Sequence, residues 1–311
     1  MKSTSLLKFL LAPILLCSPS IFSAAQENAT STKPSRNDSG GQSDLDELVD
    51  VGDHRLHVKC IGSGGATVIM EAGLGDSSRT WDKVMPEVGK FTRVCVYDRP
   101  GEGKSDRAPR TLRRFGARTY IELRTGGEIV QDLHVLLAKA GELGPYVLVG
   151  HSFGGLCAIL YAHQYPGDVV GMVLVDSSHE DQVGRDKALI TPEHAKRRHN
   201  GLMQNEEGVD MDQVLAQVRA AHWRTNIPLY VLARGRVDPY PADWSAETIA
   251  RREQAWREMQ EDHARRSSNG KLVVAEKSGH DIQDEQPELV IDAVRQVITL
   301  TRDKAGQAQT H

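Results

Sequence analysis

The strongest chemical signature in the chain is a serine between two glycines, Gly150-His151-Ser152-Phe153-Gly154. It follows the apolar run 146–149 and precedes a second apolar stretch, 156–165, so it lies where a strand turns sharply into a helix. Such a turn holds the serine hydroxyl exposed, and glycines on either side let the two arms approach closely. The helix that begins there adds partial positive charge. The spacing therefore predicts that Ser152 is a nucleophile.

A serine hydroxyl needs a base to remove its proton, and imidazole is suited to this at neutral pH. Among the 12 histidines we assign this role to His280. It lies in a glycine-containing loop after the last predicted strand, at the sheet edge where ligands bind in open α/β folds. The remaining histidines form no metal-ligand pattern, so we expect neither a metal nor a cofactor.

Short β-rich runs that alternate with helical segments would position these residues. The first two runs flank Gly52-Asp53, a hairpin turn signal, and several later runs are continuously apolar, as expected for strands covered by helices on both faces. The runs are 48–51, 56–60, 67–71, 93–97, 146–149, 172–175, 228–233 and 272–275, with the clearest helical patterns at 128–140 and 247–266. A hairpin followed by strand–helix alternation predicts a mostly parallel, three-layer α/β sheet.

The chain resembles serine hydrolases of the α/β-hydrolase superfamily, among them esterases, lipases and proline-iminopeptidase-like enzymes. Besides the Ser152 turn, Tyr97 to Ser105 (YDRPGEGKS) resembles the family's turn after its fourth strand, and Gly144 to Val149 (GPYVLV) its elbow strand. Ser278-Gly279-His280 is similar to the family's histidine loop. The resemblance implies a mostly parallel eight-stranded sheet flanked by helices, with the residue order Ser, acid, His.

The acid that would orient His280 has two candidates. Asp176 ends the sixth strand and Asp238 follows the seventh, and the superfamily uses both positions, more often the second. The segments 256–260 and 278–280, however, resemble a subgroup whose seventh-strand loop commonly lacks an acid. This favours Asp176, with Asp238 as the alternative.

Two backbone N–H groups would stabilise the oxyanion that forms during acyl transfer. One is expected to be that of Phe153, directly after the nucleophile. The resemblance selects Leu74 for the other, in the loop Ala72-Gly73-Leu74-Gly75, whose glycines allow close approach to a substrate. An ordinary glycine turn is the alternative interpretation of this loop.

Residues 178–227, between the sixth and seventh strands, are here called the lid insertion. Thr191-Pro192-Glu193 predicts the start of one helix, and Asp210 would cap another over 211–223. Two helices above the strand ends would form a small lid over Ser152. The alternative is that they complete the outer layer of the core.

The amino terminus predicts export. A basic start precedes the apolar run 9–17, which is too short to span a bilayer, and Ser23-Ala24-Ala25 carries the small residues of a cleavage site, so residues 1–25 indicate a signal peptide. We expect a periplasmic or secreted protein without an integral membrane span in the mature chain.

The domain limits follow from the distribution of apolar residues. Residues 26–44 lack large apolar side chains and predict a disordered linker, which could tether the protein to a membrane. Residues 45–300 would form the α/β-hydrolase domain and 301–311 a flexible tail.

Composition excludes some classes of function. The 38 basic residues against 42 acidic ones give a net charge of −4, without the basic excess typical of a nucleic-acid partner. In this superfamily the strands that carry Cys60 and Cys95 are neighbours, so these cysteines could form a disulfide or remain two buried thiols.

Together these features predict an exported carboxylic-ester hydrolase that acts on a small-molecule substrate through an acyl-enzyme. An amidase or aminopeptidase, or a C–C bond hydrolase, could use the same residues. From a different class, a low-turnover ligand-binding receptor could keep the fold.

Overall fold

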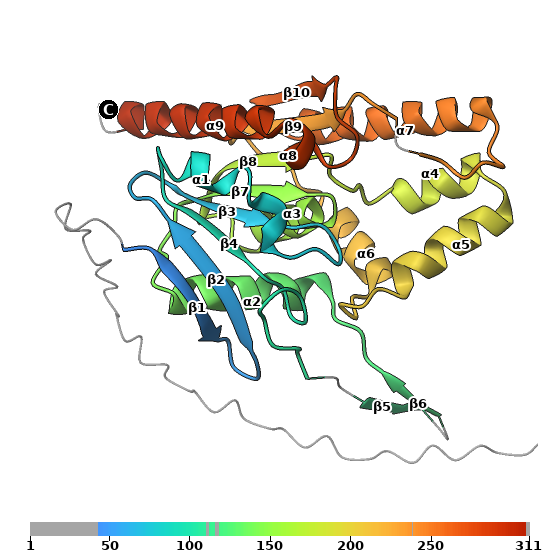
Figure 1. Ribbon diagram of the computed structural model, residues 1–311, viewed down its shortest axis with the longest axis horizontal. Coiled ribbons are helices and arrows are strands. Elements are labelled where there is room, and N and C mark those ends of the chain that lie inside the picture. Colours follow the sequence, from blue (N-terminus) through green and yellow to red (C-terminus); the bar gives the residue numbers. More distant parts are fainter. Residues whose placement is uncertain (1–42, 110–111, 116–117, 238, 309–311) are drawn as a thin grey trace, which may run out of the picture. The chain divides into compact units, whose positions relative to one another are not determined.

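The protein is described by a computed structural model that covers residues 43–109, 112–115, 118–237 and 239–308 (Figure 1). The predicted signal peptide and the predicted linker as far as residue 42 lie outside these residues. None of the helices described is long and apolar enough to cross a bilayer.

A mixed sheet of eight strands forms the centre of the domain, in the order β1-β2-β4-β3-β7-β8-β9-β10. The first two pairings, β1 with β2 and β2 with β4, are antiparallel, and the others are parallel. The strands are β1 (Leu45–Asp50), β2 (Arg55–Ile61), β3 (Thr67–Glu71), β4 (Val94–Tyr97), β7 (Tyr146–His151), β8 (Val169–Val175), β9 (Leu229–Arg234) and β10 (Gly270–Ala275). The predicted mostly parallel, eight-stranded α/β-hydrolase sheet is confirmed.

Helices cover both faces of this sheet, because successive side chains of each strand point to opposite faces. On β7, Leu148 packs in the core cluster that contains α2 (Gly126–Lys139), α3 (Phe153–Gln164) and α6 (Met211–Ala221). Its neighbours Val147 and Val149 pack in a second cluster with residues of α1 (Met85–Val88) and α9 (Pro287–Ala308). Figure 1 shows α2 and α9 on opposite sides of the sheet. The remaining helices are η1 (Ser78–Trp81), α4 (Gln182–Leu189), α5 (Pro192–Met203), α7 (Ala246–Arg265) and α8 (Ile282–Glu285).

Two segments differ from the sequence-based expectation. A small hairpin of β5 (Leu112–Phe115) and β6 (Arg118–Ile121) precedes α2, and its pattern was not predictable because Leu112 and Ile121 are exposed. The expected flexible tail over 301–311 is wrong as far as residue 308, since α9 continues to Ala308. Gly171 of β8 lets this helix lie close to the sheet: a Cβ there would overlap the Val297 side chain.

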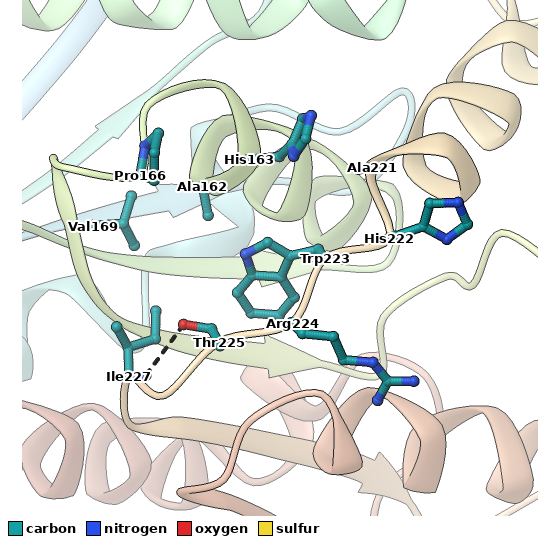
Figure 2. A pocket seen from close by; sticks show the side chains of 10 residues that line it. All are labelled: Ala162, His163, Pro166, Val169, Ala221, His222, Trp223, Arg224, Thr225 and Ile227. Atoms are coloured by element: carbon teal, nitrogen blue, oxygen red, sulfur yellow. Dashed lines mark hydrogen bonds between the residues drawn. The ribbon is translucent and has the colours of Figure 1, made fainter.

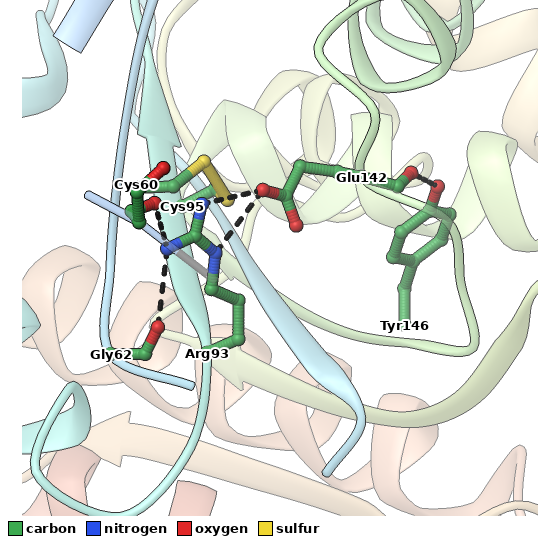
Figure 3. The surroundings of a disulfide bond; sticks show 7 residues. Cys60, Gly62, Arg93, Cys95, Glu142 and Tyr146 are labelled. Atoms are coloured by element: carbon green, nitrogen blue, oxygen red, sulfur yellow. Dashed lines mark hydrogen bonds and ion pairs between the residues drawn. A yellow bond between two sulfur atoms is a disulfide. The ribbon is translucent and has the colours of Figure 1, made fainter. Parts of the chain in front are cut away.

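Cys60 and Cys95 form a disulfide between β2 and β4, where they are directly opposite each other with Cα atoms 4.1 Å apart (Figure 3). Glu142 lies close enough for its carboxylate and the two sulfurs to resemble a group of metal ligands. The sulfurs are bonded to each other, however, and Glu142 Oε1 pairs with Arg93 Nη2 at 2.7 Å. The arrangement is therefore a disulfide beside a buried ion pair.

Candidate active site

Ser152 occupies a strained turn at the carboxyl end of β7, directly before α3. Its φ of 52° and ψ of −117° place its backbone in a region that residues other than glycine seldom adopt. Backbone hydrogen bonds to the end of β8 and to the segment after it hold the turn, because Ser152 N donates to Val175 O at 3.1 Å and Ser178 N donates to Ser152 O at 3.0 Å. Ser152 is thus fixed at the carboxyl edge of the sheet, at the positive end of a helix.

Three glycines make this turn possible, each for a different reason. A Cβ on Gly150 would lie 2.5 Å from Gly154 O, so this glycine lets the two arms of the turn close, as the sequence predicts. A Cβ on Gly154 would instead lie 2.5 Å from Glu71 O, at the end of β3. A Cβ on Gly155 would overlap the side chain of Ser177 after β8. The turn therefore packs directly against the segments after β3 and β8.

His280 and Asp176 meet at the same edge of the sheet. Asp176 follows β8, is fully buried and has a φ of 39°. His280, in the loop after β10, donates a hydrogen bond from Nδ1 to Asp176 Oδ2 at 2.6 Å. The alternative acid, Asp238, lies outside the described residues.

His151 attaches the His280 loop to the serine turn. Its Nε2 donates to His280 O at 3.1 Å, and the two imidazole rings are 4.7 Å apart. Burial, with a smaller contribution from His280, lowers the pKa of His151 to about 3, so His151 is neutral at physiological pH. This role was not predictable from the sequence, because it depends on contact between segments that are far apart in the chain.

Within the described part of the chain, Asp176 accepts three further hydrogen bonds besides that from His280. Arg234 Nη1 donates to Oδ2 at 2.8 Å, while Arg234 N at 3.0 Å and Trp256 Nε1 at 2.8 Å donate to Oδ1. Burial alone would raise the pKa of Asp176, but the hydrogen bond from His280 and the charge of Arg234 outweigh it, so this pKa is lowered. Asp176 is therefore a carboxylate at neutral pH.

The protonation of His280 depends on the same group of residues. Burial lowers the pKa of His280, but the hydrogen bond and charge of Asp176 more than reverse this, and the pKa is above its ordinary value. Arg234 acts in the opposite direction through its positive charge. The imidazole is 35% exposed, so it is open to solvent on one side.

The loop Ala72-Gly73-Leu74-Gly75 lies beside the serine turn. A Cβ on Gly73 would be 3.2 Å from His151 Nδ1, which places the loop against the residue before Ser152. Phe153, the first residue of α3, is buried. The two segments that carry the expected oxyanion donors, Leu74 and Phe153, are thus adjacent to Ser152.

The lid insertion contains three helices, α4, α5 and α6, of which α5 and α6 begin where the sequence predicts. α6 packs on α2 and α3 through buried residues such as Val214 and Val218, so it completes the outer layer of the core. The loop between α5 and α6 reaches further: Glu207 Oε1 accepts a hydrogen bond of 2.6 Å from Gly75 N. The insertion thus contacts the loop that contains Leu74.

A separate hollow of about 340 Å³ lies at the opposite edge of the sheet (Figure 2). It is lined by residues at the end of α3, the end of α6 and the segment before β9, with Trp223 among them. Val169, at the amino end of β8, belongs to its lining, whereas Ser152 follows the carboxyl end of β7. This hollow is therefore not part of the Ser152 site.

Comparison with known proteins agrees with this architecture. Residues 68–293 match the alpha/beta hydrolase family. The protein YqjL of Bacillus subtilis is 29% identical over 247 residues, which cover 78% of this chain and 87% of YqjL. An AB hydrolase superfamily protein of Gibberella zeae is 22% identical over 295 residues, covering 75% of this chain and 86% of its own. Other relatives match only in part: a probable transporter of Hormonema carpetanum is 33% identical over 43% of this chain and 18% of its own length.

Solved structures show the same fold. A thermophilic esterase from Thermogutta terrifontis superposes with a TM-score of 0.55 at 19% identity, covering 83% of this chain and 98% of the esterase. A bromoperoxidase from Bacillus anthracis superposes with a TM-score of 0.53 at 16% identity, covering 82% of this chain and 100% of its own. At these identities the likeness concerns the fold alone. With the family match over most of the domain, the chain belongs to the alpha/beta hydrolase family.

Proposed function

We propose that the protein is a serine hydrolase that cleaves carboxylic esters of small molecules through an acyl-enzyme on Ser152. The observation that carries this proposal is the hydrogen bond of 2.6 Å between His280 Nδ1 and the buried carboxylate of Asp176, in a loop attached to the Ser152 turn. A solvated surface histidine would have no reason to be held in this way. The combination of a nucleophile, a base and an orienting acid is what acyl transfer requires.

In this mechanism the Ser152 hydroxyl transfers its proton to His280 Nε2, because Nδ1 is bonded to Asp176. The serine oxygen attacks the ester carbonyl carbon, and the oxyanion that forms accepts hydrogen bonds from the N–H groups of Phe153 and Leu74. The imidazolium then gives its proton to the leaving alcohol as the C–O bond breaks. Water attacks the acyl-enzyme in the same way, releasing the acid and restoring Ser152.

Asp176 is suited to stabilise the imidazolium that forms in both steps. It stays ionised over the working pH range, and it is fixed by Arg234 and Trp256 so that its Oδ2 remains directed at His280. Loss of the corresponding carboxylate in a serine protease costs on the order of 10⁴ in kcat, partly because the imidazole adopts the wrong tautomer. We expect a loss of this size for Asp176→Asn.

We further propose that the protein acts outside the cytoplasm, as the apolar start of the chain suggests. The disulfide between Cys60 and Cys95 supports this, because such bonds persist mainly in oxidising compartments. A cellular fractionation that finds the protein with reduced cysteines in the cytoplasm would contradict it.

The ester-hydrolase proposal is tested with p-nitrophenyl esters of increasing acyl length. The parent protein should turn over many equivalents, Ser152→Ala should not, and Asp176→Asn should lose kcat by on the order of 10⁴. Asp238→Asn is the matched control and should remain close to the parent. Greater damage from Asp238→Asn would assign the acid to Asp238 instead. A parent that binds esters without turnover would favour a ligand-binding receptor.

A further inference from the structure

The buried side chain of Arg99 contacts both the loop that contains Leu74 and the side chain of Phe153. Arg99 lies in the turn after β4, and its side chain is 2% exposed. Nη1 donates to Ala72 O at 2.8 Å, and Nη2 donates to Gly73 O. The same guanidinium lies over the ring of Phe153, 5.2 Å from its centroid. One cation therefore contacts both segments expected to supply oxyanion donors.

Its principal ionic partner comes from the lid insertion. Arg99 Nε and Nη2 each donate to the Glu207 carboxylate at 2.8 Å. This bidentate ion pair fixes the orientation of both the guanidinium and the carboxylate. The Glu207 side chain is also only 2% exposed, and its Oε1 accepts the hydrogen bond from Gly75 N. Since Glu207 is 108 residues from Arg99 in sequence, the pair joins the insertion to the central sheet.

These contacts restrain the peptide groups on either side of Leu74. The peptide group that contains Leu74 N–H also contains Gly73 C=O, and the two point in opposite directions because the peptide is planar and trans. Arg99 and the backbone N–H of Asp76 (3.2 Å) both donate to Gly73 O, and Glu207 holds the next N–H, that of Gly75. The Leu74 N–H is thus directed away from Arg99 by restraints on either side of it.

The charge balance also depends on Glu207. A second carboxylate, Glu71, lies 3.4 Å from Arg99 Nη1, but burial raises the pKa of Glu71 despite the opposing charge of Arg99. Glu71 also accepts a hydrogen bond from Tyr97 at 2.6 Å. Glu207 makes a bidentate contact with Arg99 that is shorter than the contact of Glu71, so Glu207 is the better placed counter-ion for the buried guanidinium.

We propose that Glu207 is a positioning residue that, through Arg99, couples the seating of the lid insertion to the formation of the oxyanion hole. This inference rests on the proposed ester-hydrolase function. When the insertion is seated, Arg99 and Glu207 hold the Leu74 peptide ready to bind the developing negative charge. When Glu207 is withdrawn, Arg99 and Gly75 lose a shared partner and the Leu74 peptide can turn.

The test compares Glu207→Gln with Glu206→Gln, an exposed neighbour that serves as matched control. Removal of one oxyanion donor costs about 10²–10³ in kcat, so partial misorientation in Glu207→Gln should lower kcat about 10- to 100-fold with little change in KM. The Ki of a trifluoromethyl ketone, whose adduct carries an oxyanion, should rise by the same factor. The Ki of the matching alcohol should not change.

The pH profile separates this role from damage to the catalytic residues. The acid limb of kcat/KM should be the same in Glu207→Gln as in the parent, because the His280–Asp176 pair is not touched. If Glu207→Gln does not fold, Glu207→Asp provides the second test. The aspartate keeps the negative charge beside Arg99 but is too short to reach both Arg99 and Gly75 N. We therefore expect a smaller fall in kcat and a smaller rise in the trifluoromethyl ketone Ki than in Glu207→Gln.

Failure of this inference is distinguishable from failure of the proposed function. Hydrolysis that survives Ser152→Ala would refute the proposed function, whatever Glu207 does. Hydrolysis that requires Ser152, with Glu207→Gln equal to Glu206→Gln in kcat and in the trifluoromethyl ketone Ki, would overturn the positioning role alone. A fall in melting temperature without a change in that Ki would also overturn it, because the role would then be structural only.

Discussion

Arg234 and His280 both donate hydrogen bonds to one oxygen of Asp176. The positive charge of Arg234 therefore acts at short range on the pKa of His280. Arg234 Nη1 is 2.8 Å from Asp176 Oδ2, and His280 Nδ1 is 2.6 Å from the same atom. A guanidinium in this position disfavours the imidazolium and thereby lowers the pKa of His280. Removal of the cation should therefore raise this pKa.

The size of the effect follows from the geometry. Because both nitrogens contact one oxygen, they are at most about 5.4 Å apart. Two unit charges at this distance interact by about 3 kcal/mol at an effective dielectric constant of about 20. Solvent at the partly exposed imidazole weakens the interaction, and we expect about half of it to remain. This corresponds to a rise of about one unit in the pKa of His280.

The variant must not create a new buried charge. Arg234 Nη2 also pairs with Glu253 at 2.9 Å, so Arg234→Met alone would leave that carboxylate without this partner. The double variant Arg234→Met/Glu253→Gln avoids this, and Glu253→Gln alone is its control. Arg234→Lys keeps the positive charge and should keep the pH profile of the parent.

The assay is kcat/KM for a p-nitrophenyl ester across pH, with circular dichroism to show that each variant is folded. The base must be neutral to accept the proton of Ser152, so a higher pKa of His280 moves the loss of activity to higher pH. We expect the acid limb of the double variant to lie about one pH unit above that of the parent. An acid limb that does not move, or that moves to lower pH, would refute this reasoning.

Three further substitutions test the packing around the site. Trp256→Phe removes a hydrogen bond to the buried Asp176 carboxylate and should lower the free energy of unfolding by about 1.5–3 kcal/mol, measured in urea; an unchanged midpoint would contradict it. Gly154→Ala would force a Cβ to within 2.5 Å of Glu71 O. It should cost about 1–3 kcal/mol and lower kcat, and a fully active variant would contradict the tight contact at β3. Cys60→Ser removes the disulfide and should lower the free energy of unfolding by about 3–4 kcal/mol, measured in guanidinium chloride. Reduction of the parent should lower it by a similar amount, and no change in either experiment would contradict a stabilising disulfide.

Much of the fold could be predicted from sequence, because each element carries its own signal. The strand before Ser152 is apolar on both faces since α3 covers one side and α9 the other, and that continuous apolar run is visible without a structure. The hairpin β5–β6 had no such signal, because Leu112 and Ile121 are exposed. The length of α9 was missed because residues 301–308 include no large apolar side chain and therefore show no helical apolar pattern.

The residues that surround and orient the catalytic groups were harder to predict, because their partners are distant in the sequence. Asp176 and His280 were identified from strand ends and from family resemblance. Arg234 is 58 residues from Asp176 in sequence. Glu207 lies in an insertion whose polar sequence resembles any solvated loop. Only the folded arrangement shows that these two side chains are buried and paired.

The central claim is that Ser152 is the nucleophile, and labelling with a fluorophosphonate tests it most directly. Intact-mass spectrometry should show one adduct per chain, and peptide mapping should locate it on Ser152. The adduct should be absent from Ser152→Ala, and its rate of formation should fall as the pH drops through the pKa of His280. No adduct on the folded protein, or an adduct on a different residue, would contradict the account.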